Sequence, residues 1–297
     1  MSSGLNSTSV EVVTFNMNGK GLALGEVISA IKKKSDLIVI CIQEADHGVA
    51  HYEQQITAFM ENYECKTRAD ISWHTPQALK LLMFVYQKNY TGMFTFTTDI
   101  IPFQFAHTKY WTTFRPWKGA IIISCTSTKF EHPFIFAGAH LHADSKPRDI
   151  EQRKYDIEII KKFIEGKYKH SHWCLFGDLN MRNDARGNDE FNTCKKKFHL
   201  YEEHFDGMTY RVDPNHRDHY QGENKCSQTD RVCHSSKKNL IMGEYKVVVN
   251  RDTQDTASGA GSDHKAVFET FDIRHTVRDN KFTIEYPIEG LQCNPEQ

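Results

Sequence analysis

Short runs of β-branched, aliphatic and aromatic residues recur along the whole chain of 297 residues. Each run has the length of one strand, and turn-forming residues such as Gly, Asn, Asp and Ser often bound it, as is typical of strands. Ten such runs provide enough strand for two sheets. They are VEVVTFNM (10–17), DLIVICIQE (36–44), ALKLLMFVYQ (78–87), GMFTFTT (92–98), GAIIISCTS (119–127), PFIFAGAHL (133–141), HWCLFGD (172–178), TDRVCHS (229–235), YKVVVN (245–250) and HKAVFETFDI (264–273).

Three segments between these runs have the apolar spacing of amphipathic helices, residues 25–35, 48–63 and 146–168. In the third, isoleucines at 150, 157, 160 and 164 form one apolar face, and Lys and Arg occupy the other. Helices interleaved with strands, without an internal repeat, favour an α/β fold. We expect a four-layer α-β-β-α sandwich, in which two mostly antiparallel sheets pack face to face under outer helices. A single domain is expected over residues 8–286, with flexible termini at 1–7 and 287–297.

The overall charge excludes a strong electrostatic preference for any partner, because 37 basic residues stand against 38 acidic ones. Nucleic acid is therefore disfavoured as a partner. The eight cysteines form no C-x-x-C pair, and several lie in apolar runs, so they read as buried thiols in a reducing compartment. The N-terminus lacks the pattern of a secretory signal, and no apolar run approaches the roughly 20 residues of a membrane span. A cytoplasmic protein is expected, with at most peripheral membrane contact.

Polar side chains stand at the ends of six of the strand-like runs. A strand that runs into Gly or a polar residue delivers that side chain to the edge of its sheet, where clefts form. Each residue alone has an ordinary explanation, such as a turn, a helix cap or a hydrogen-bonded core histidine. Their joint occurrence in one chain is hard to explain in that way. The residues are Asn16 and Asn18, Glu44, His140, Asp178 and Asn180, Asp230, and Asp263 with His264.

The ordered set N-x-N-G, Q-E, H-L, G-D-L-N-x-R, D-R and S-D-H-K resembles the endonuclease/exonuclease/phosphatase superfamily over about residues 11–273. Within it, the chain is most similar to the inositol polyphosphate 5-phosphatases, through FGDLNMR (176–182), TDRV (229–232), WKGA (117–120) and SDHKAV (262–267). The segments RPWKGA (115–120) and AHLHADS (139–145) are similar to those of the type I inositol trisphosphate 5-phosphatases. The resemblance implies metal-dependent cleavage of a phosphoester between two stacked sheets.

The resemblance implies a Mg²⁺ site on Glu44, with Asn18 nearby and Asn16 organising the metal carboxylate. Mg²⁺ prefers oxygen ligands and keeps several waters, which suits this set better than a closed cage of His and Cys.

The resemblance also implies roles around the scissile phosphate. Asp178 is expected to orient and deprotonate the attacking water, and Asn180 to position water and phosphate. His264 is expected to contact the phosphate while Asp230 holds its tautomer and charge. His140 would be a second donor to the phosphate, and Asp263 would complete the carboxylate set.

Substrate recognition is expected to depend on cations outside this core. Lys118, Arg182 and Arg231 lie in matching blocks and can pair with phosphates, although Arg231 can equally buttress Asp178 or Asp230. The P-T-Y-K segment of the family is interpreted as absent, so that Arg211, His216 or Arg217 would take over its phosphate contact. These residues lie in a polar, irregular stretch, residues 205–229, that reads as a long functional loop.

Three functions follow from these residues. The first is a Mg²⁺-dependent inositol polyphosphate 5-phosphatase that acts on soluble inositol phosphates or on lipid headgroups. The second keeps the fold and changes the substrate, as in a nuclease, a DNA-repair phosphodiesterase or a sphingomyelinase-like enzyme. The third is a binding module without catalysis, which the retention of Glu44, Asp178, Asn180, Asp263 and His264 disfavours. The near-neutral charge and the lack of a basic, aromatic stripe disfavour a nuclease.

Overall fold

The computed structural model describes most of the chain between residues 7 and 275. The described residues are 7–19, 24–72, 79–89, 94–103, 118–143, 147–181, 190–202, 209–211, 226–227, 229–236, 238, 240–248 and 264–275. The proposed flexible termini therefore lie almost entirely outside the described residues, as does most of the stretch 205–229. The domain boundaries at 8 and 286 stay a prediction.

Two sheets form the centre of the molecule. The first has six strands in the order β12-β13-β1-β2-β4-β3. The second has five, in the order β11-β8-β7-β6-β5, and a separate two-stranded sheet pairs β10 with β9. The strands are β1 (Ser7–Asn16), β2 (Leu37–Ala45), β3 (Tyr63–Ile71), β4 (Lys80–Lys88), β5 (Thr95–Pro102), β6 (Gly119–Thr126), β7 (Phe134–His140), β8 (His172–Asp178), β9 (Tyr210–Arg211), β10 (Cys226–Ser227), β11 (Asp230–His234), β12 (Leu240–Val248) and β13 (Ala266–Arg274).

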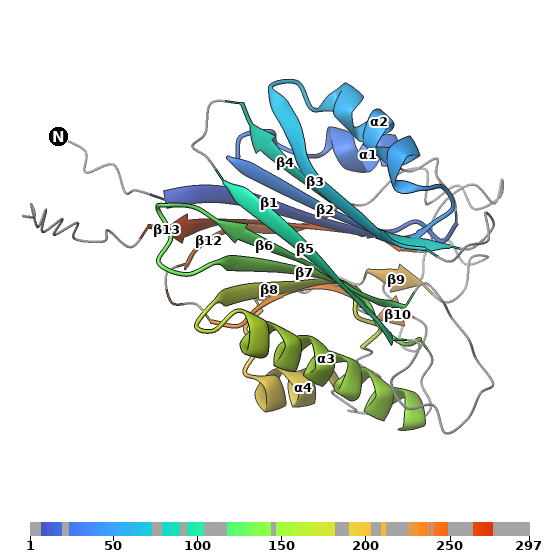
Figure 1. The fold of residues 1–297 in the computed structure, drawn as a ribbon. Coiled ribbons are helices and arrows are strands. Elements are labelled where there is room, and N and C mark those ends of the chain that lie inside the picture. The colour runs from blue at the N-terminus through green and yellow to red at the C-terminus, as the bar shows by residue number, and fades with distance from the viewer. Residues whose placement is uncertain are drawn as a thin grey trace, which may run out of the picture.

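The layers are those of the expected sandwich (Figure 1). The helices α1 (Leu24–Ser29) and α2 (Val49–Phe59) cover the outer face of the first sheet, and α3 (Pro147–Lys167) and α4 (Glu190–Phe198) cover that of the second. Each large sheet has one parallel pair, β1 with β2 and β7 with β8, and its other pairs are antiparallel. The predicted four-layer α/β fold with mostly antiparallel sheets is confirmed.

Three apolar clusters hold the layers together. One lies between the sheets, and one lies under each pair of helices. The sheets pack so closely that a Cβ atom on Gly138 would lie 2.8 Å from Cys41 Sγ on the facing sheet. The thiols contribute to this packing, since the six cysteines whose side chains are described are free and five of them are buried. Removal of this apolar surface from water is the main favourable term in folding.

Several elements differ from the expected ones. The first helix ends at Ser29 rather than near 35, and Lys33 beyond it has a left-handed backbone (φ 54°), which a helix cannot continue through. The second helix ends at Phe59, since Asn62 is also left-handed (φ 67°). The sequence reading missed β3, an edge strand rich in polar residues, and the short helix α4. An edge strand needs few apolar residues because much of it faces solvent.

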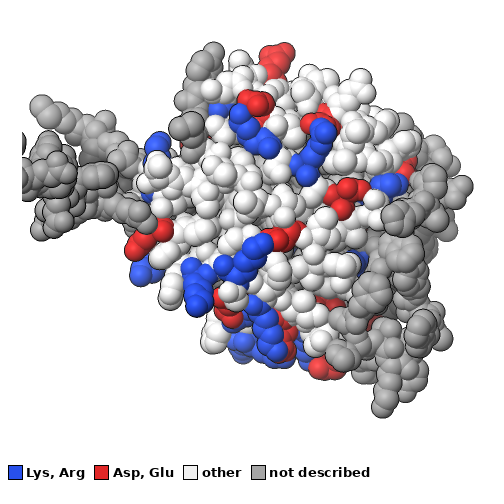
Figure 2. Space-filling model, in the orientation of Figure 1, with Lys and Arg blue, Asp and Glu red and all other residues white. Residues whose placement is uncertain are grey.

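Acidic and basic side chains are interspersed over the face of the molecule drawn in Figure 2. In the described part of the chain, Lys162 pairs with Glu158 at 2.7 Å and Lys154 with Glu151 at 2.6 Å. Among the described residues, none of the helices combines the length and the apolar character of a bilayer span. The surface thus fits the balanced charge of the sequence.

Candidate active site

The topology brings six strand ends to one edge of the sandwich. Since β1 and β2 are parallel, as are β7 and β8, their carboxyl ends point the same way. The strands β11 and β13 run against their neighbours β8 and β1, so it is their amino ends that reach this edge. The register sets Asp178 directly opposite His140 on one side and Asp230 on the other. The polar residues that are far apart in the sequence are therefore neighbours here.

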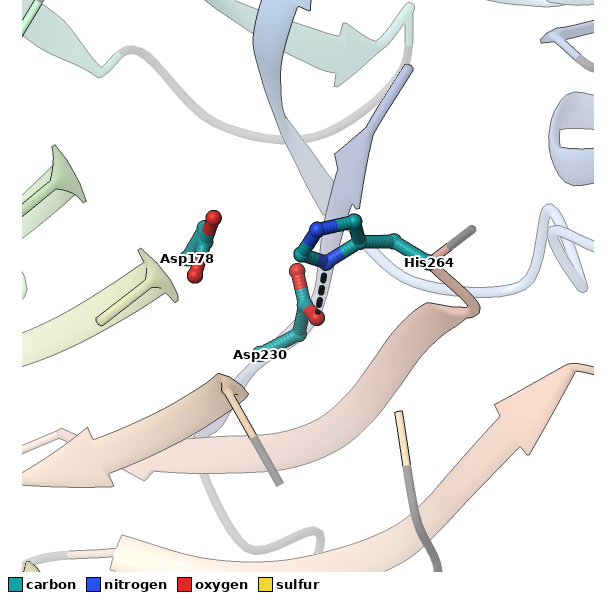
Figure 3. Close-up of side chains that lie close together, drawn as sticks. All are labelled: Asp178, Asp230 and His264. Atoms are coloured by element: carbon teal, nitrogen blue, oxygen red, sulfur yellow. Dashed lines mark hydrogen bonds and ion pairs between the residues drawn. The ribbon is translucent and has the colours of Figure 1, made fainter. Parts of the chain in front are cut away.

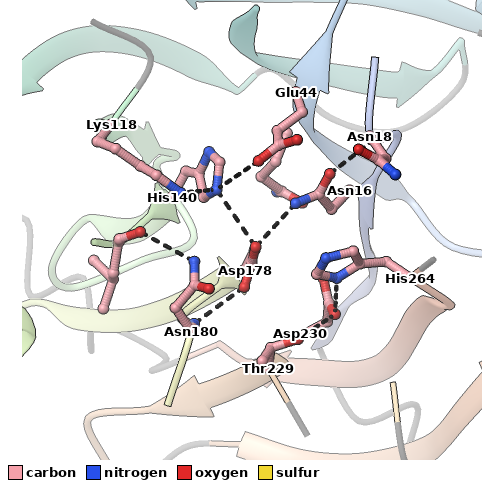
Figure 4. A network of polar contacts seen from close by, with 12 residues as sticks. Asn16, Asn18, Glu44, Lys118, His140, Asp178, Asn180, Thr229, Asp230 and His264 are labelled. Atoms are coloured by element: carbon pink, nitrogen blue, oxygen red, sulfur yellow. Dashed lines mark hydrogen bonds and ion pairs between the residues drawn. The ribbon is translucent and has the colours of Figure 1, made fainter. Parts of the chain in front are cut away.

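Asp178 is the centre of the network (Figure 4). Its Oδ2 accepts a hydrogen bond of 2.9 Å from Asn16 Nδ2, and its Oδ1 accepts one of 3.0 Å from the backbone N–H of Asn180. His140 Nε2 lies 3.4 Å from Oδ2, and the side chain of Asp178 is 2% exposed. A buried carboxylate needs such donors, because leaving it unpaired costs several kcal/mol. Asn180 is fixed in turn by its own bond of 3.1 Å to the carbonyl of Leu141.

The backbone at this edge adopts conformations that most side chains avoid. Asn18, Glu44 and Asn180 all have a left-handed backbone, with φ of 50°, 52° and 52°. Asparagine tolerates this region, but for glutamate it is uncommon and strained. Glu44 lies where the pairing of β2 with β4 shifts register, and such a bulge re-aims a side chain. Three predicted site residues thus owe their directions to the same local conformation.

Gly177 is required by the close approach of β7 to β8. Its φ is 139°, and a Cβ atom there would lie 1.9 Å from the carbonyl oxygen of Ala139. No residue with a Cβ atom fits between Phe176 and Asp178. The glycine of the G-D-L-N sequence is therefore needed for the backbone conformation.

Asp230 and His264 form a buried pair beside Asp178 (Figure 3). His264 Nδ1 lies 2.8 Å from Asp230 Oδ2, which also accepts a hydrogen bond of 3.0 Å from Thr229 Oγ1. Asp230 Oδ1 is buried and has no hydrogen-bond partner among the described residues. The structure thus brings together the histidine and the carboxylate that the sequence analysis paired.

The surroundings separate the pKa values of the two aspartates. Burial alone would raise the pKa of Asp178, but the nearby His264, His140 and Lys118 more than offset it and hold that pKa below its usual range. Burial raises the pKa of Asp230 to about 6, although His264 opposes the shift. Burial, reinforced by Lys118, lowers the pKa of His140. Asp178 is therefore an anion that accepts hydrogen bonds, and His140 is a neutral ring at neutral pH.

Lys118 and Glu44 meet at His140. The Lys118 ammonium contacts His140 Nε2. Lys118 directly precedes β6 and is 2% exposed. The Glu44 carboxylate lies 3.6 Å from the same nitrogen and is 22% exposed, more than the other acids of the site. His140 is its one partner among the described residues. A carboxylate that is held at a sheet edge and keeps free oxygens has room for a cation.

The donor set fits a divalent metal. Ligand atoms of Asp178, Asp230 and His264 lie within 4.8 Å of one another, and the Glu44 carboxylate lies 3.6 Å from the same His140 nitrogen that is 3.4 Å from Asp178. Asn16 orients its neighbours rather than acting as a simple metal ligand. Its Oδ1 accepts a hydrogen bond of 2.9 Å from the backbone N–H of Asn18, and its Nδ2 donates one to Asp178. Oxygen donors predominate, which suits Mg²⁺ better than a soft metal.

Arg231 does not face this site. Along β11, Val232 faces the core between the sheets, and Cys233 faces the helices; Arg231 shares the side of Cys233. Its guanidinium lies 3.0 Å from both oxygens of Glu202 and 3.7 Å from the ring centre of Phe191 in α4. These contacts correct the expectation that Arg231 binds substrate. They also show that Arg231 forms its ion pair with Glu202, whereas the expected acidic partners were Asp178 and Asp230.

Other predicted residues lie outside the described part of the chain. These are Asp263, Arg182, His216 and Arg217, together with the side chain of Arg211, whose backbone belongs to β9. Their roles stay predictions.

The sequence reading missed Thr209 and Thr229. The Oγ1 atom of Thr209 accepts hydrogen bonds from the backbone N–H groups of Thr229 and Asp230, both at 3.0 Å. A signal was present, since Thr209 and Tyr210 keep the T-Y of the P-T-Y-K segment that was interpreted as absent.

The comparisons with known proteins agree with this architecture. The model of endonuclease/exonuclease/phosphatase family 2 matches residues 13–270. No curated protein matches the chain by sequence.

Solved structures match over nearly the whole chain. The inositol polyphosphate 5-phosphatase domain of SPsynaptojanin, in complex with inositol (1,4)-bisphosphate and calcium ion, has a TM-score of 0.62 and 16% identity over 90% of this chain and 84% of that one. D. rerio TDP2 complexed with single strand DNA product gives 0.58 and 15% over 89% and 98%. A ferrous NO complex of Cimex nitrophorin gives 0.58 and 16% over 91% and 99%. At these identities the likeness shows the fold alone.

Proposed function

This chain belongs to the endonuclease/exonuclease/phosphatase family, and from that premise we propose that it is a Mg²⁺-dependent inositol polyphosphate 5-phosphatase. It would remove the 5-phosphate of inositol 1,4,5-trisphosphate and of related inositol phosphates or phosphoinositides. One observation carries the proposal: Asn16, His140 and Asn180 surround the carboxylate of Asp178, with Glu44 and the Asp230–His264 pair beside it. The motif resemblance to the 5-phosphatases narrows the substrate.

Hydrolysis adds the oxygen of a water to phosphorus, breaks the bond between phosphorus and the ring oxygen, and transfers one proton of that water to the leaving ring oxygen. Asp178 accepts a hydrogen bond from this water and orients it, and the Asn180 amide positions water and phosphate. Because the pKa of Asp178 is held low, the carboxylate is ionised at neutral pH and can accept this hydrogen bond. His264 is oriented through Nδ1 by Asp230, and its protonated ring would donate from Nε2 to a phosphate oxygen.

Glu44 would hold the divalent ion, with Asn18 and Asp178 as further oxygen donors. When bound, the ion neutralises charge on the phosphoryl oxygens and on the leaving alkoxide. His140 and Lys118 add donors on the β6–β7 side, where both are buried. A lysine in this position attracts phosphate as a point charge. Arg182, Arg211 and Arg217 are proposed to contact the other ring phosphates.

Two rival functions share the fold. A phosphodiesterase is one, as TDP2 was solved with a single strand DNA product, and a binding protein is another, as nitrophorin was solved as a ferrous NO complex. The balanced charge weighs against a nucleic-acid enzyme, because polyanion binding depends on many basic contacts. The carboxylates and histidines of the site weigh against a silent module. We propose a cytoplasmic enzyme with at most peripheral contact with membranes.

Phosphate release would test the proposal. The wild type is incubated with inositol 1,4,5-trisphosphate, its lipid counterpart or single-stranded DNA, each with Mg²⁺ or with a chelator. We expect release from an inositol substrate with Mg²⁺ alone, and a loss of about 10³-fold in Asp178→Asn. The ratio of soluble to lipid turnover would assign the natural headgroup.

Asp272→Asn is the matched control, because it changes a carboxylate at the far end of β13 in the same way. It should retain wild-type turnover. Cleavage of DNA alone would overturn the proposed substrate, and full turnover in chelator would overturn the metal dependence.

A further inference from the structure

Thr209 joins three segments of the chain at the back of the site. It is fully buried just before β9, and its Oγ1 accepts the backbone N–H groups of Thr229 and Asp230, both at 3.0 Å. Its own carbonyl oxygen accepts the backbone N–H of Lys265 at 2.7 Å. One residue therefore satisfies three buried donors, which lie at the start of β11 and just before β13.

These contacts are adjacent to the Asp230–His264 hydrogen bond on both sides. Thr209 binds the backbone of Asp230 itself, and it binds the residue that directly follows His264. Asp230 and His264 are 34 residues apart in the sequence, and their side chains meet at 2.8 Å. Asp230 is the first residue of β11 and pairs with Asp178 of β8, whereas His264 precedes β13. The pairing of β13 does not include His264, and Thr209 supplies an additional tie between the two residues.

Thr209 also leads directly into β9, whose residues Tyr210 and Arg211 pair with Ser227 and Cys226 of β10. The strand β10 leads in turn to Thr229 and Asp230. The two strands and the Thr209 contacts thus connect the described residues 209–211, 226–227 and 229–230 into one unit, the β9–β10 unit.

We propose that Thr209 is a positioning residue that sets the separation and orientation of Asp230 and His264 and ties them to the β9–β10 unit. The inference rests on the proposed function, since it assigns to Thr209 the alignment of the pair that would contact the scissile phosphate. A displacement of about 1 Å in such a pair can lower turnover by about 100-fold. Thr209 would act through Asp230 and His264, because its Oγ1 already accepts two backbone N–H groups.

The test compares two substitutions at this position. Thr209→Val keeps the branched shape and removes the acceptor, whereas Thr209→Ser keeps the hydroxyl. We expect kcat of Thr209→Val to fall by about 10- to 100-fold with KM within about 3-fold, and Thr209→Ser to keep kcat within about 3-fold of wild type. Thr8→Val is the matched control, because Thr8 is a buried threonine at the far end of β1 that bonds His275. It should leave kcat unchanged.

A second measurement does not depend on activity. We expect the Nδ1 proton of His264, held in the hydrogen bond to Asp230, to give a low-field NMR resonance in the folded protein. We expect this resonance to shift or broaden in Thr209→Val and to stay in Thr209→Ser and Thr8→Val. If the wild type hydrolyses none of the phosphate substrates, the proposed function fails, but the resonance still tests the positioning of the pair. An unchanged resonance in Thr209→Val, together with a kcat equal to that of Thr8→Val, would overturn the inference.

Discussion

The strands β11 and β13 carry two histidine–carboxylate pairs with nearly the same geometry. At the site end, His264 Nδ1 lies 2.8 Å from Asp230 Oδ2; at the other end of β11, His234 Nε2 lies 2.7 Å from Glu269 Oε2. Both pairs are buried, and each leaves one carboxylate oxygen without a hydrogen-bond partner among the described residues. The chemistry of the side chains therefore does not distinguish them.

The surroundings of the two histidine–carboxylate pairs distinguish them. The site pair lies at the edge where Asp178 and five other strand ends meet, so a ligand can complete its hydrogen bonds. The distal pair lies between the sheets, with the ring of Phe271 at 4.9 Å from that of His234 and no other acid within ligand distance among the described residues. We infer that the first pair serves turnover and the second serves stability. Position in the fold, rather than residue type, assigns the role.

Loss of the site pair should produce the largest effect on turnover. His264→Gln and Asp230→Asn are each expected to lower kcat by about 10³-fold, because the donor to the phosphate is lost or released from its orientation. The free energy of unfolding should change by less than about 1 kcal/mol, since both replacements keep hydrogen-bonding groups. Steady-state kinetics and urea denaturation of the same preparations would measure both. Equal losses of turnover in variants of the distal pair would contradict the assignment of turnover to the site pair and of stability to the distal pair.

Loss of the distal pair should instead lower stability. In His234→Leu, the Glu269 carboxylate remains buried without its partner, which is expected to cost about 3–5 kcal/mol. Turnover per folded molecule should stay within about 3-fold of wild type. Urea denaturation of His234→Leu, Glu269→Met and the double variant would measure the coupling, and the double variant should recover most of the loss. If the double variant is no more stable than His234→Leu, the two side chains act independently.

The two pairs also differ in how far the sequence predicts them. Asp230 and His264 belong to matching motifs, and strand register brings such motifs to one edge, so this pair could be predicted. His234 and Glu269 belong to no motif, and their meeting depends on how the two sheets stack, which no local pattern encodes. The misplaced Arg231 is a different case. Side chains alternate along a strand, so an inward Asp230 already implied that Arg231 faces the helices.

The same distinction applies to the elements. Runs of apolar residues predicted the central strands because their burial on both faces leaves a continuous signal. The edge strand β3 and the helix α4 carried too few apolar residues to be recognised. The conformations of Asn18, Glu44 and Asn180 depend on contacts between strands, so the sequence could indicate which polar residues meet at this edge but not how the backbone aims them.

Added Mg²⁺ should stabilise the site end of the molecule alone. A ligand that binds the folded state stabilises it by about 2.7 kcal/mol at 100 times its dissociation constant. We expect thermal unfolding to shift upward with Mg²⁺ in wild type and in Glu269→Met, and not in Glu44→Gln, which loses the carboxylate charge of the site. Titration of Mg²⁺ against the unfolding temperature would measure this. A full shift in Glu44→Gln would remove Glu44 from the metal site.

Glu11 of β1 is a buried acid whose hydrogen-bond partner is a backbone N–H group and not a histidine. It can therefore be compared with Asp230 and Glu269, which each have a histidine partner. Its Oε1 accepts the backbone N–H of Lys32 at 3.3 Å, and the side chain is fully buried. Burial raises the pKa of Glu11, although this hydrogen bond and the charges of Lys246 and Lys32 oppose the shift. A carboxyl group with a raised pKa in the folded state favours folding at pH values below its unfolded pKa. That contribution is lost as the pH rises through the folded pKa.

Glu11→Gln should therefore stabilise the protein at pH 7, by no more than about 1 kcal/mol, the scale of one pKa unit. The gain should vanish near pH 4, where the glutamate is protonated in the folded protein. Urea denaturation of wild type and variant across this pH range would measure the effect, and Glu64→Gln, with a side chain 62% exposed, is the control for a lost surface charge. A loss of stability at pH 7 would mean that Lys32 and Lys246 compensate the buried charge of Glu11 as well as His234 compensates that of Glu269. A histidine partner would then not explain the difference in stability between these two buried acids.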